Sequence, residues 1–263
     1  MFRRCAGIAA AVLFSASLVG CGSSGTGATS ASSRSGSPAL TGTITVFAAS
    51  SLTGTFTSLG KQFETAHPGT SVVFSFGASS TLAQQILQGA PADLFASAAP
   101  KNMQQVIDGG EVSVAKDFAR NEAEIVVFPA KAAEIRGVAD LGRPGVKVAL
   151  CLAQVPCGVV AHSVLASNNV VVKPVTEGLD VKSTLAYAVS GEADAAIVYV
   201  TDAKAAGKAV VGVEIPPGMN ASTAYSIGVV QRSTKGSLAT AFEAFVLSQA
   251  GRGVLEEAGF LSP

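Results

Sequence analysis

Short apolar runs rich in β-branched residues alternate with helical patterns along most of the chain. Chains of this kind fold as helices packed on a mostly parallel sheet, so the pattern predicts an α/β fold. The strands are expected at residues 44–48, 72–76, 93–97, 124–128, 147–150, 170–175, 195–200 and 223–230. The helices are expected at about 52–67, 81–88, 100–108, 159–167, 181–190, 201–206, 238–249 and 253–258.

The alternating elements form two sets, and the chain is long enough for two lobes of about a hundred residues each. We predict that the chain crosses between the lobes twice, near residues 121–124 and 222–225. The first lobe would comprise 42–122 and 224–263, and the second would be an insert of 123–223. Ligands of open α/β sheets bind beyond the carboxyl ends of the strands, so the cleft between the lobes is the expected site.

The N-terminal segment MFRRCAGIAAAVLFSASLVG has two arginines followed by an apolar stretch too short to span a bilayer. It predicts a secretory signal peptide over residues 1–20. The next residue, Cys21, follows Leu-Val-Gly, and this string resembles the lipobox of bacterial lipoproteins, in which the cysteine is acylated. Residues 21–41 contain few apolar side chains and are expected to form a flexible tether. The resemblance implies a lipid-anchored protein on the extracytoplasmic face of the cell membrane. An ordinary signal peptide with a chance cysteine is the alternative.

Charge and histidine content exclude several classes of function. Loss of two arginines with the signal peptide lowers Lys+Arg from 18 to 16 against 18 acidic residues, a net charge near −2, which indicates no nucleic-acid surface. The GxSxG and P-loop motifs are absent from the sequence. The two histidines, His67 and His162, lie in helical patterns, which disfavours a Ser-His-Asp site. We therefore expect a binding protein and not an enzyme.

Five positions share one local pattern, in which a strand ends and a helix begins or a hydroxyl side chain follows. Helix N-termini carry unpaired N–H groups and the positive end of the helix dipole, and both favour anions. Serine adds a hydroxyl donor, so the set predicts an oxyanion site without a cationic side chain. The alternative is that the two serines are ordinary helix N-caps. The five positions are Ser51, Ser79, Cys157, Val181 and Tyr199.

The strings TVFAASSLT, SFGASSTLAQQI, GAPADLFASA, VPCG and AIVYVTDA resemble the periplasmic molybdate-binding proteins of ABC importers, and the likeness extends over residues 43–261. The resemblance implies a two-lobed, type II solute-binding fold with mostly parallel sheets, flanking helices and an interlobe cleft. It also implies a monomer that captures molybdate or tungstate, delivers it to an ABC permease and needs no cofactor. Another tetrahedral oxyanion such as sulfate is the alternative ligand, and an adhesin or structural lipoprotein is the alternative class.

The resemblance also assigns a role to each of the five positions. Ser51 and Ser79 match the two ligand serines of the family, and Tyr199 matches its ligand tyrosine. Val181 and Cys157 match residues that donate backbone N–H groups. Cys157 stands where the family usually has alanine, which changes the pocket wall but not the N–H donor. All five would contact the oxygens of the anion and not the metal atom itself.

Two cysteines and two aspartates near these positions need a separate interpretation. Cys151 and Cys157 do not have a common zinc-site spacing. In an exported protein a nearby pair is expected to form a disulfide, with two free thiols as the alternative. Asp93 is expected to accept from local backbone donors, and Asp180 to cap the helix that follows it, so that neither carboxylate faces the anion.

Overall fold

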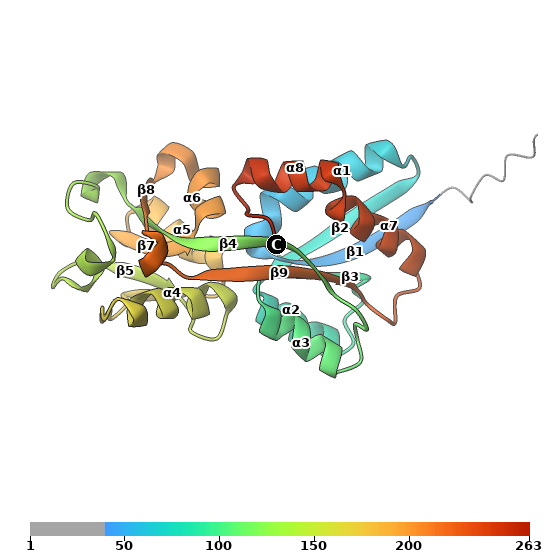
Figure 1. Cartoon of the computed structure of the whole chain (residues 1–263), viewed down its shortest axis with the longest axis horizontal. Coiled ribbons are helices and arrows are strands. Elements are labelled where there is room, and N and C mark those ends of the chain that lie inside the picture. Colours follow the sequence, from blue (N-terminus) through green and yellow to red (C-terminus); the bar gives the residue numbers. More distant parts are fainter. Residues whose placement is uncertain (1–39) are drawn as a thin grey trace, which may run out of the picture. The chain divides into compact units, whose positions relative to one another are not determined.

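A nine-stranded mixed sheet organises residues 40–263, the part of the chain that this computed structural model describes (Figure 1). The predicted signal peptide, Cys21 and nearly all of the predicted tether lie outside the described residues. The strand order is β2-β1-β3-β9-β4-β7-β5-β6, and β8 pairs with β4 beside this path. The strands are β1 (Gly42–Ala49), β2 (Thr70–Gly77), β3 (Leu94–Ser97), β4 (Lys116–Val127), β5 (Val148–Cys151), β6 (Thr176–Gly178), β7 (Ala195–Tyr199), β8 (Val211–Glu214) and β9 (Ser222–Val229).

In the described part of the chain, eight α-helices connect and cover these strands. α3 and α4 each have proline in the first turn, where the missing N–H costs nothing. α5 and α8 end at Gly191 and Gly259, whose φ values of 78° and 102° suit glycine. No helix among residues 40–263 is long and apolar enough to cross a membrane. The helices are α1 (Thr53–Ala66), α2 (Ser79–Leu87), α3 (Pro100–Asp108), α4 (Pro156–Ser167), α5 (Val181–Ser190), α6 (Val200–Ala206), α7 (Gly236–Leu247) and α8 (Gln249–Ala258).

The long strands β4 and β9 connect two lobes. In Figure 1 they run side by side through the middle of the sheet. Residues 116–122 of β4 pair with β9, and residues 123–127 pair with β7 and β8. The predicted parallel pairs are present on both sides, β1 with β2 and β3, and β5 with β6 and β7. The two connecting strands add antiparallel pairs to them, so the sheet is mixed.

Each lobe is built around its own apolar core. In lobe 1, α1, α7 and α8 cover one face of the sheet around an aromatic group that includes Phe56, Phe63 and Phe242, and α2 and α3 cover the other face. In lobe 2, α4, α5 and α6 pack on β4, β5 and β7 through small aliphatic side chains. The predicted boundaries after residues 122 and 223 lie where β4 and β9 pass between these cores, and the division at those residues stays a prediction.

Three differences from the sequence pattern have physical causes. Residues 170–175 are not a strand: Val171 is 87 % exposed, Pro174 lacks an N–H, and the strand is the following β6. β4 begins at Lys116, because its polar first half pairs with β9 and does not show as an apolar run. α4 begins at Pro156 and not at residue 159, so Cys157 lies inside its first turn.

Candidate functional site

One small pocket lies between the lobes, and all five residues that the sequence singled out line it. Its cavity volume is about 10 Å³, far less than the roughly 300–1,000 Å³ of pockets for larger organic ligands. Lobe 1 and lobe 2 both contribute to the wall. The lining residues are Ala49, Ser50, Ser51, Gly77, Ala78, Ser79, Ala98, Val155, Pro156, Cys157, Asp180, Val181 and Tyr199.

Three helices begin at this pocket. Ser79 is the first residue of α2, Cys157 is the second of α4, and Val181 is the first of α5. The N–H groups of a first helical turn have no partner within the helix. The sequence folds in this way because each helix directly follows a strand or a tight turn at the carboxyl edge of the sheet. The pocket therefore collects unpaired N–H donors and the positive ends of three helix dipoles.

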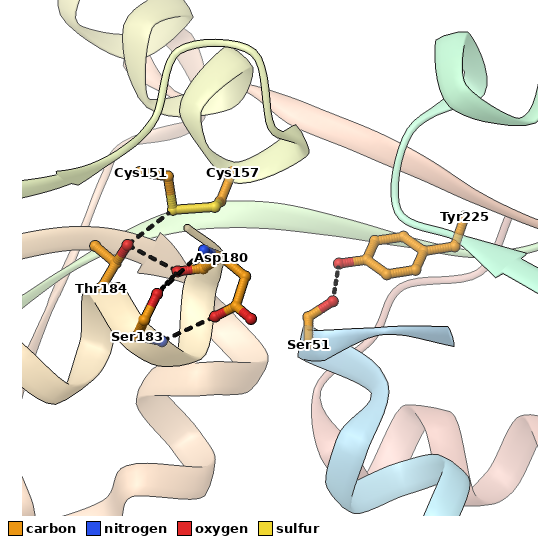
Figure 2. Close-up of a disulfide and its surroundings, with 7 residues drawn as sticks. All are labelled: Ser51, Cys151, Cys157, Asp180, Ser183, Thr184 and Tyr225. Carbon is orange, nitrogen blue, oxygen red and sulfur yellow. Dashed lines mark hydrogen bonds between the residues drawn. A yellow bond between two sulfur atoms is a disulfide. The ribbon is translucent and has the colours of Figure 1, made fainter. Parts of the chain in front are cut away.

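Ser51 and Ser79 are not helix N-caps. Neither the short 3-10 helix Ser50–Leu52 nor α2 has a side-chain cap. Ser79 Oγ accepts a hydrogen bond from the Ala98 N–H at 2.9 Å, which leaves its own proton available to the pocket. Ser51 Oγ lies 2.9 Å from the hydroxyl of Tyr225 (Figure 2). Both hydroxyls are thus held by groups from other parts of the fold, so the N-cap alternative is wrong.

Tyr199 ends β7, and its hydroxyl is buried without a hydrogen-bond partner among the described residues. Burial raises the pKa of Tyr199 well above its ordinary value, and the neighbouring Tyr225 and Asp202 raise it further. The phenol therefore keeps its proton at neutral pH. An unpaired buried hydroxyl is uncommon and costly. Here it is a donor in the wall of the pocket, where a ligand can pair with it.

Among residues 40–263, no cationic side chain lines the pocket. The nearest lysine in the sequence, Lys182, forms an ion pair of 2.8 Å with the buried Asp202. Burial raises the pKa of Asp202, and Lys182 opposes that shift. Of the described residues, Asp180 alone is charged in the pocket wall. Its Oδ1 accepts from the Ser183 N–H at 2.9 Å in a capping box, as predicted for this N-cap.

A disulfide joins Cys151 at the end of β5 to Cys157 in the first turn of α4 (Figure 2). The predicted disulfide is therefore present, and the free-thiol alternative is wrong. Thr184 Oγ1 lies 3.1 Å from the Cys151 sulfur. A Cβ at Gly158 would lie 1.9 Å from the Leu152 carbonyl oxygen, so the Cys-Gly sequence allows α4 to begin against this loop. The bridge ties the N-terminus of α4 to the sheet that carries the other lobe 2 residues.

Asp93 does not line the pocket, and a second, larger cavity lies beside the pocket. Asp93 Oδ2 accepts from the Thr45 N–H at 2.7 Å and Oδ1 from the Ser233 hydroxyl, so its donors are distant in the chain and not the local backbone donors predicted for it. A larger cavity of about 720 Å³ adjoins the small pocket and shares Gly77, Ala78, Val155, Pro156 and Asp180 with it. No group of three His, Cys, Asp or Glu side chains among residues 40–263 could hold a metal ion.

Sequence reasoning missed two buried polar residues behind the pocket. Tyr225 of β9 contacts Ser51, and Asn121 of β4 contacts Tyr225 and Thr201. Both are fully buried. The sequence did offer one indication of them: each is a polar residue in a strand, at a predicted crossing between the lobes.

A two-lobed α/β fold with a small donor-lined pocket between its lobes defines a solute-binding protein. Residues 44–261 match the model of the family described as bacterial extracellular solute-binding protein, and the chain belongs to this family. Its members bind solutes outside the cytoplasm and are not enzymes, which confirms the predicted class.

Among the relatives, a molybdate-binding protein ModA of Mycobacterium tuberculosis is 39 % identical over 258 residues, which are 98 % of this chain and 97 % of that protein. ModA of Escherichia coli is 32 % identical over 201 residues, covering 72 % of this chain and 78 % of that protein. The periplasmic molybdate-binding protein of Azotobacter vinelandii has a similar structure, with a TM-score of 0.73, 20 % identity and coverage of 84 % and 99 %. The last likeness concerns the fold alone.

Proposed function

We propose that this protein is the extracytoplasmic receptor that captures molybdate, or tungstate, and delivers it to the permease of an ABC importer. The observation that carries the proposal is the convergence of Ser51, Ser79, Cys157, Val181 and Tyr199 on one pocket without a cation. The identity to molybdate-binding relatives over nearly the whole chain supports the same ligand. Molybdate would be a cargo and not a cofactor.

The donor set suits a dianion that carries no proton. Backbone N–H groups can only donate, and the hydroxyls each have a hydrogen to offer. Hydrogen bonds to a charged acceptor are stronger than those between neutral groups. The N-termini of α2, α4 and α5 supply the compensating positive charge as fixed dipoles. The ligand would therefore exchange its water shell for protein donors when the lobes enclose it.

Selectivity among tetrahedral oxyanions would follow from protonation and size. Phosphate keeps at least one proton near neutral pH, and that proton needs an acceptor. Asp180 is the one carboxylate in the wall, and one of its oxygens already caps α5. A proton left unpaired costs about 1–3 kcal/mol. Sulfate carries no proton but is smaller than molybdate, so its hydrogen bonds would be stretched in a pocket set for the larger ion.

Calorimetric titration of the exported protein with a panel of oxyanions at pH 7 tests the proposal. We expect molybdate and tungstate to bind with similar dissociation constants, sulfate much more weakly, and phosphate negligibly. Sulfate binding as tightly as molybdate would favour a sulfate receptor instead. Tight phosphate binding would mean that the Asp180 carboxylate serves as an acceptor for the ligand.

We further propose that Cys21 carries the lipid anchor and that the protein acts as a monomer. The lipobox-like string in the sequence supports the anchor. Fractionation of cells that express the wild type and Cys21→Ala tests it. We expect the wild type in the membrane fraction and the variant in the soluble or secreted fraction. Equal distribution of both would contradict the anchor.

A further inference from the structure

Behind the pocket, a chain of buried polar groups links both lobes and both connecting strands. Asn121 Nδ2 lies 2.8 Å from Thr201 Oγ1 of α6 and 3.5 Å from the hydroxyl of Tyr225. That hydroxyl lies 2.9 Å from Ser51 Oγ in lobe 1 (Figure 2). None of these residues except Ser51 lines the pocket. The chain meets the pocket wall at Ser51 Oγ and also at Tyr199, whose ring centroid lies 6.2 Å from that of Tyr225.

The orientation of the Asn121 amide is fixed by its other partner. Asn121 Oδ1 accepts from the Glu122 N–H at 3.1 Å, so the Nδ2 group faces Thr201 and Tyr225. An amide nitrogen has only hydrogens to present and cannot accept a proton. The Tyr225 proton therefore cannot go to Asn121. The contact between Asn121 Nδ2 and the Tyr225 hydroxyl is weak, because the two atoms are 3.5 Å apart. Even so, Asn121 can only be its donor and Tyr225 its acceptor.

Ser51 Oγ is then the acceptor for the Tyr225 proton. Tyr225 is fully buried, and burial raises the pKa of its phenol, so it remains a donor across the physiological range. If Ser51 donated to Tyr225 instead, the phenolic proton would be left with the Asn121 amide, which cannot accept it, and the neighbouring Tyr199 hydroxyl, which makes no hydrogen bond of good geometry, whereas Ser51 Oγ lies at 2.9 Å. Buried donors are seldom left unpaired. The hydrogen bond is therefore donated by the Tyr225 hydroxyl and accepted by Ser51 Oγ.

We propose that Tyr225 is a positioning residue that fixes the Ser51 hydroxyl as a donor toward the pocket, and that it thereby sets the selectivity against protonated oxyanions. A serine oxygen that accepts from Tyr225 has its own proton left for the ligand. Without Tyr225 the same hydroxyl can rotate and present a lone pair. The pocket would then gain an acceptor for a ligand that carries a proton. This inference rests on the proposed function and deepens it.

A double-mutant cycle tests whether Tyr225 acts through Ser51. The variants are Tyr225→Phe, Ser51→Ala and the double variant, each titrated with molybdate and with inorganic phosphate at pH 7. We expect Tyr225→Phe to weaken molybdate binding by about three- to tenfold and to lower the molybdate-to-phosphate affinity ratio by at least about tenfold. In the Ser51→Ala background, Tyr225→Phe should change the molybdate dissociation constant by less than about twofold.

Two controls distinguish a positioning role of the Tyr225 hydroxyl from a role in packing alone. Tyr187→Phe removes the phenol of the one tyrosine that neither lines the pocket nor belongs to the chain, and it should bind both anions as the wild type does. Thermal melting of every variant reports folding. Should Tyr225→Phe not fold, Asn121→Leu removes the amide that directs the Tyr225 proton, and it should lower the affinity ratio in the same direction.

The outcomes are distinguishable. An equal loss from Tyr225→Phe with and without Ser51, at an unchanged affinity ratio, would overturn the positioning role and leave only a packing role. An unchanged affinity for both anions would overturn it as well. Molybdate binding by the wild type tests the proposed function by itself: its absence would refute that function, whereas a failed cycle with tight wild-type binding would refute only the role of Tyr225.

Discussion

Removal of the Tyr199 hydroxyl is expected to weaken ligand binding without loss of stability. The hydroxyl is buried and has no hydrogen-bond partner among the described residues. Tyr199→Phe therefore leaves no new unpaired group in the ligand-free protein. The free energy of unfolding should stay the same or rise, by up to about 1–3 kcal/mol if the whole cost of the unpaired group is relieved.

Ligand binding should change in the opposite direction. A hydrogen bond to a charged acceptor contributes roughly 1.5–3 kcal/mol, so the dissociation constant for molybdate should rise about ten- to a hundredfold. Calorimetry measures that change directly. Chemical denaturation provides a second measure: at a molybdate concentration about 100-fold above the wild-type constant, the wild type gains about 2.7 kcal/mol, whereas a variant that binds a hundredfold more weakly gains about 0.4 kcal/mol.

Two results would refute this reasoning. If Tyr199→Phe bound molybdate as tightly as the wild type, the hydroxyl would not contact the ligand. If the ligand-free variant lost more than about 1 kcal/mol, the hydroxyl would have a structural partner in solution. Tyr187→Phe is the matched control, because it makes the same chemical change outside the pocket.

Three further changes test other parts of the structure. Ser79→Ala should weaken molybdate binding by about ten- to a hundredfold and should also lower stability by about 1 kcal/mol, because the buried Ala98 N–H loses its acceptor; full stability would contradict the Ala98 contact. Reduction of the Cys151–Cys157 bridge should cost stability near the low end of about 2–4 kcal/mol, because the closed loop is short. It should also weaken molybdate binding, since α4 loses its tie to the sheet, and identical titrations before and after reduction would refute that link. Glu124→Gln should raise stability at pH 7 by about 0.2–1 kcal/mol, because Glu124 lies opposite Glu214 on antiparallel strands. Burial and then Glu214 raise the pKa of Glu124, so the folded state favours its protonated form; the gain from Glu124→Gln should be present at pH 7 and vanish below about pH 4 in urea denaturation.

The sequence predicts the pocket residues well because their positions follow from local structure. Ser79, Cys157 and Val181 begin helices that directly follow a strand or a turn, and such starts can be recognised from a few neighbouring residues. Parallel strands bring their carboxyl ends to one edge of the sheet. We can therefore predict that residues distant in the chain lie together without knowing their side-chain contacts.

Features that depend on long-range pairing could not be predicted in the same way. The first half of β4 is polar, and it is a strand only because β9 pairs with it about a hundred residues later in the chain. Residues 170–175 have the composition of a strand, yet Val171 finds no partner to cover it and remains exposed. The Asn121–Tyr225–Ser51 contacts join three separate segments, and no local pattern indicates their geometry.

No described cation lies in the pocket wall, so the proposed site would have to hold an anion through the helix N-termini. A helix N-terminus carries the equivalent of about half a positive charge, so the starts of α2, α4 and α5 together supply roughly +1.5 against a dianion. These charges are fixed by the backbone and cannot swing out of the pocket. Lys182, the one cation adjacent in sequence to a pocket residue, is held by Asp202. In the proposed complex these dipoles would lie in direct contact with the ligand, so salt should screen the enclosed complex far less than it screens pairs of exposed charges. Because the mature chain carries a net charge near −2, raised ionic strength should screen its repulsion of a dianion and speed the association of molybdate while changing dissociation little, which stopped-flow measurements at several salt concentrations can separate.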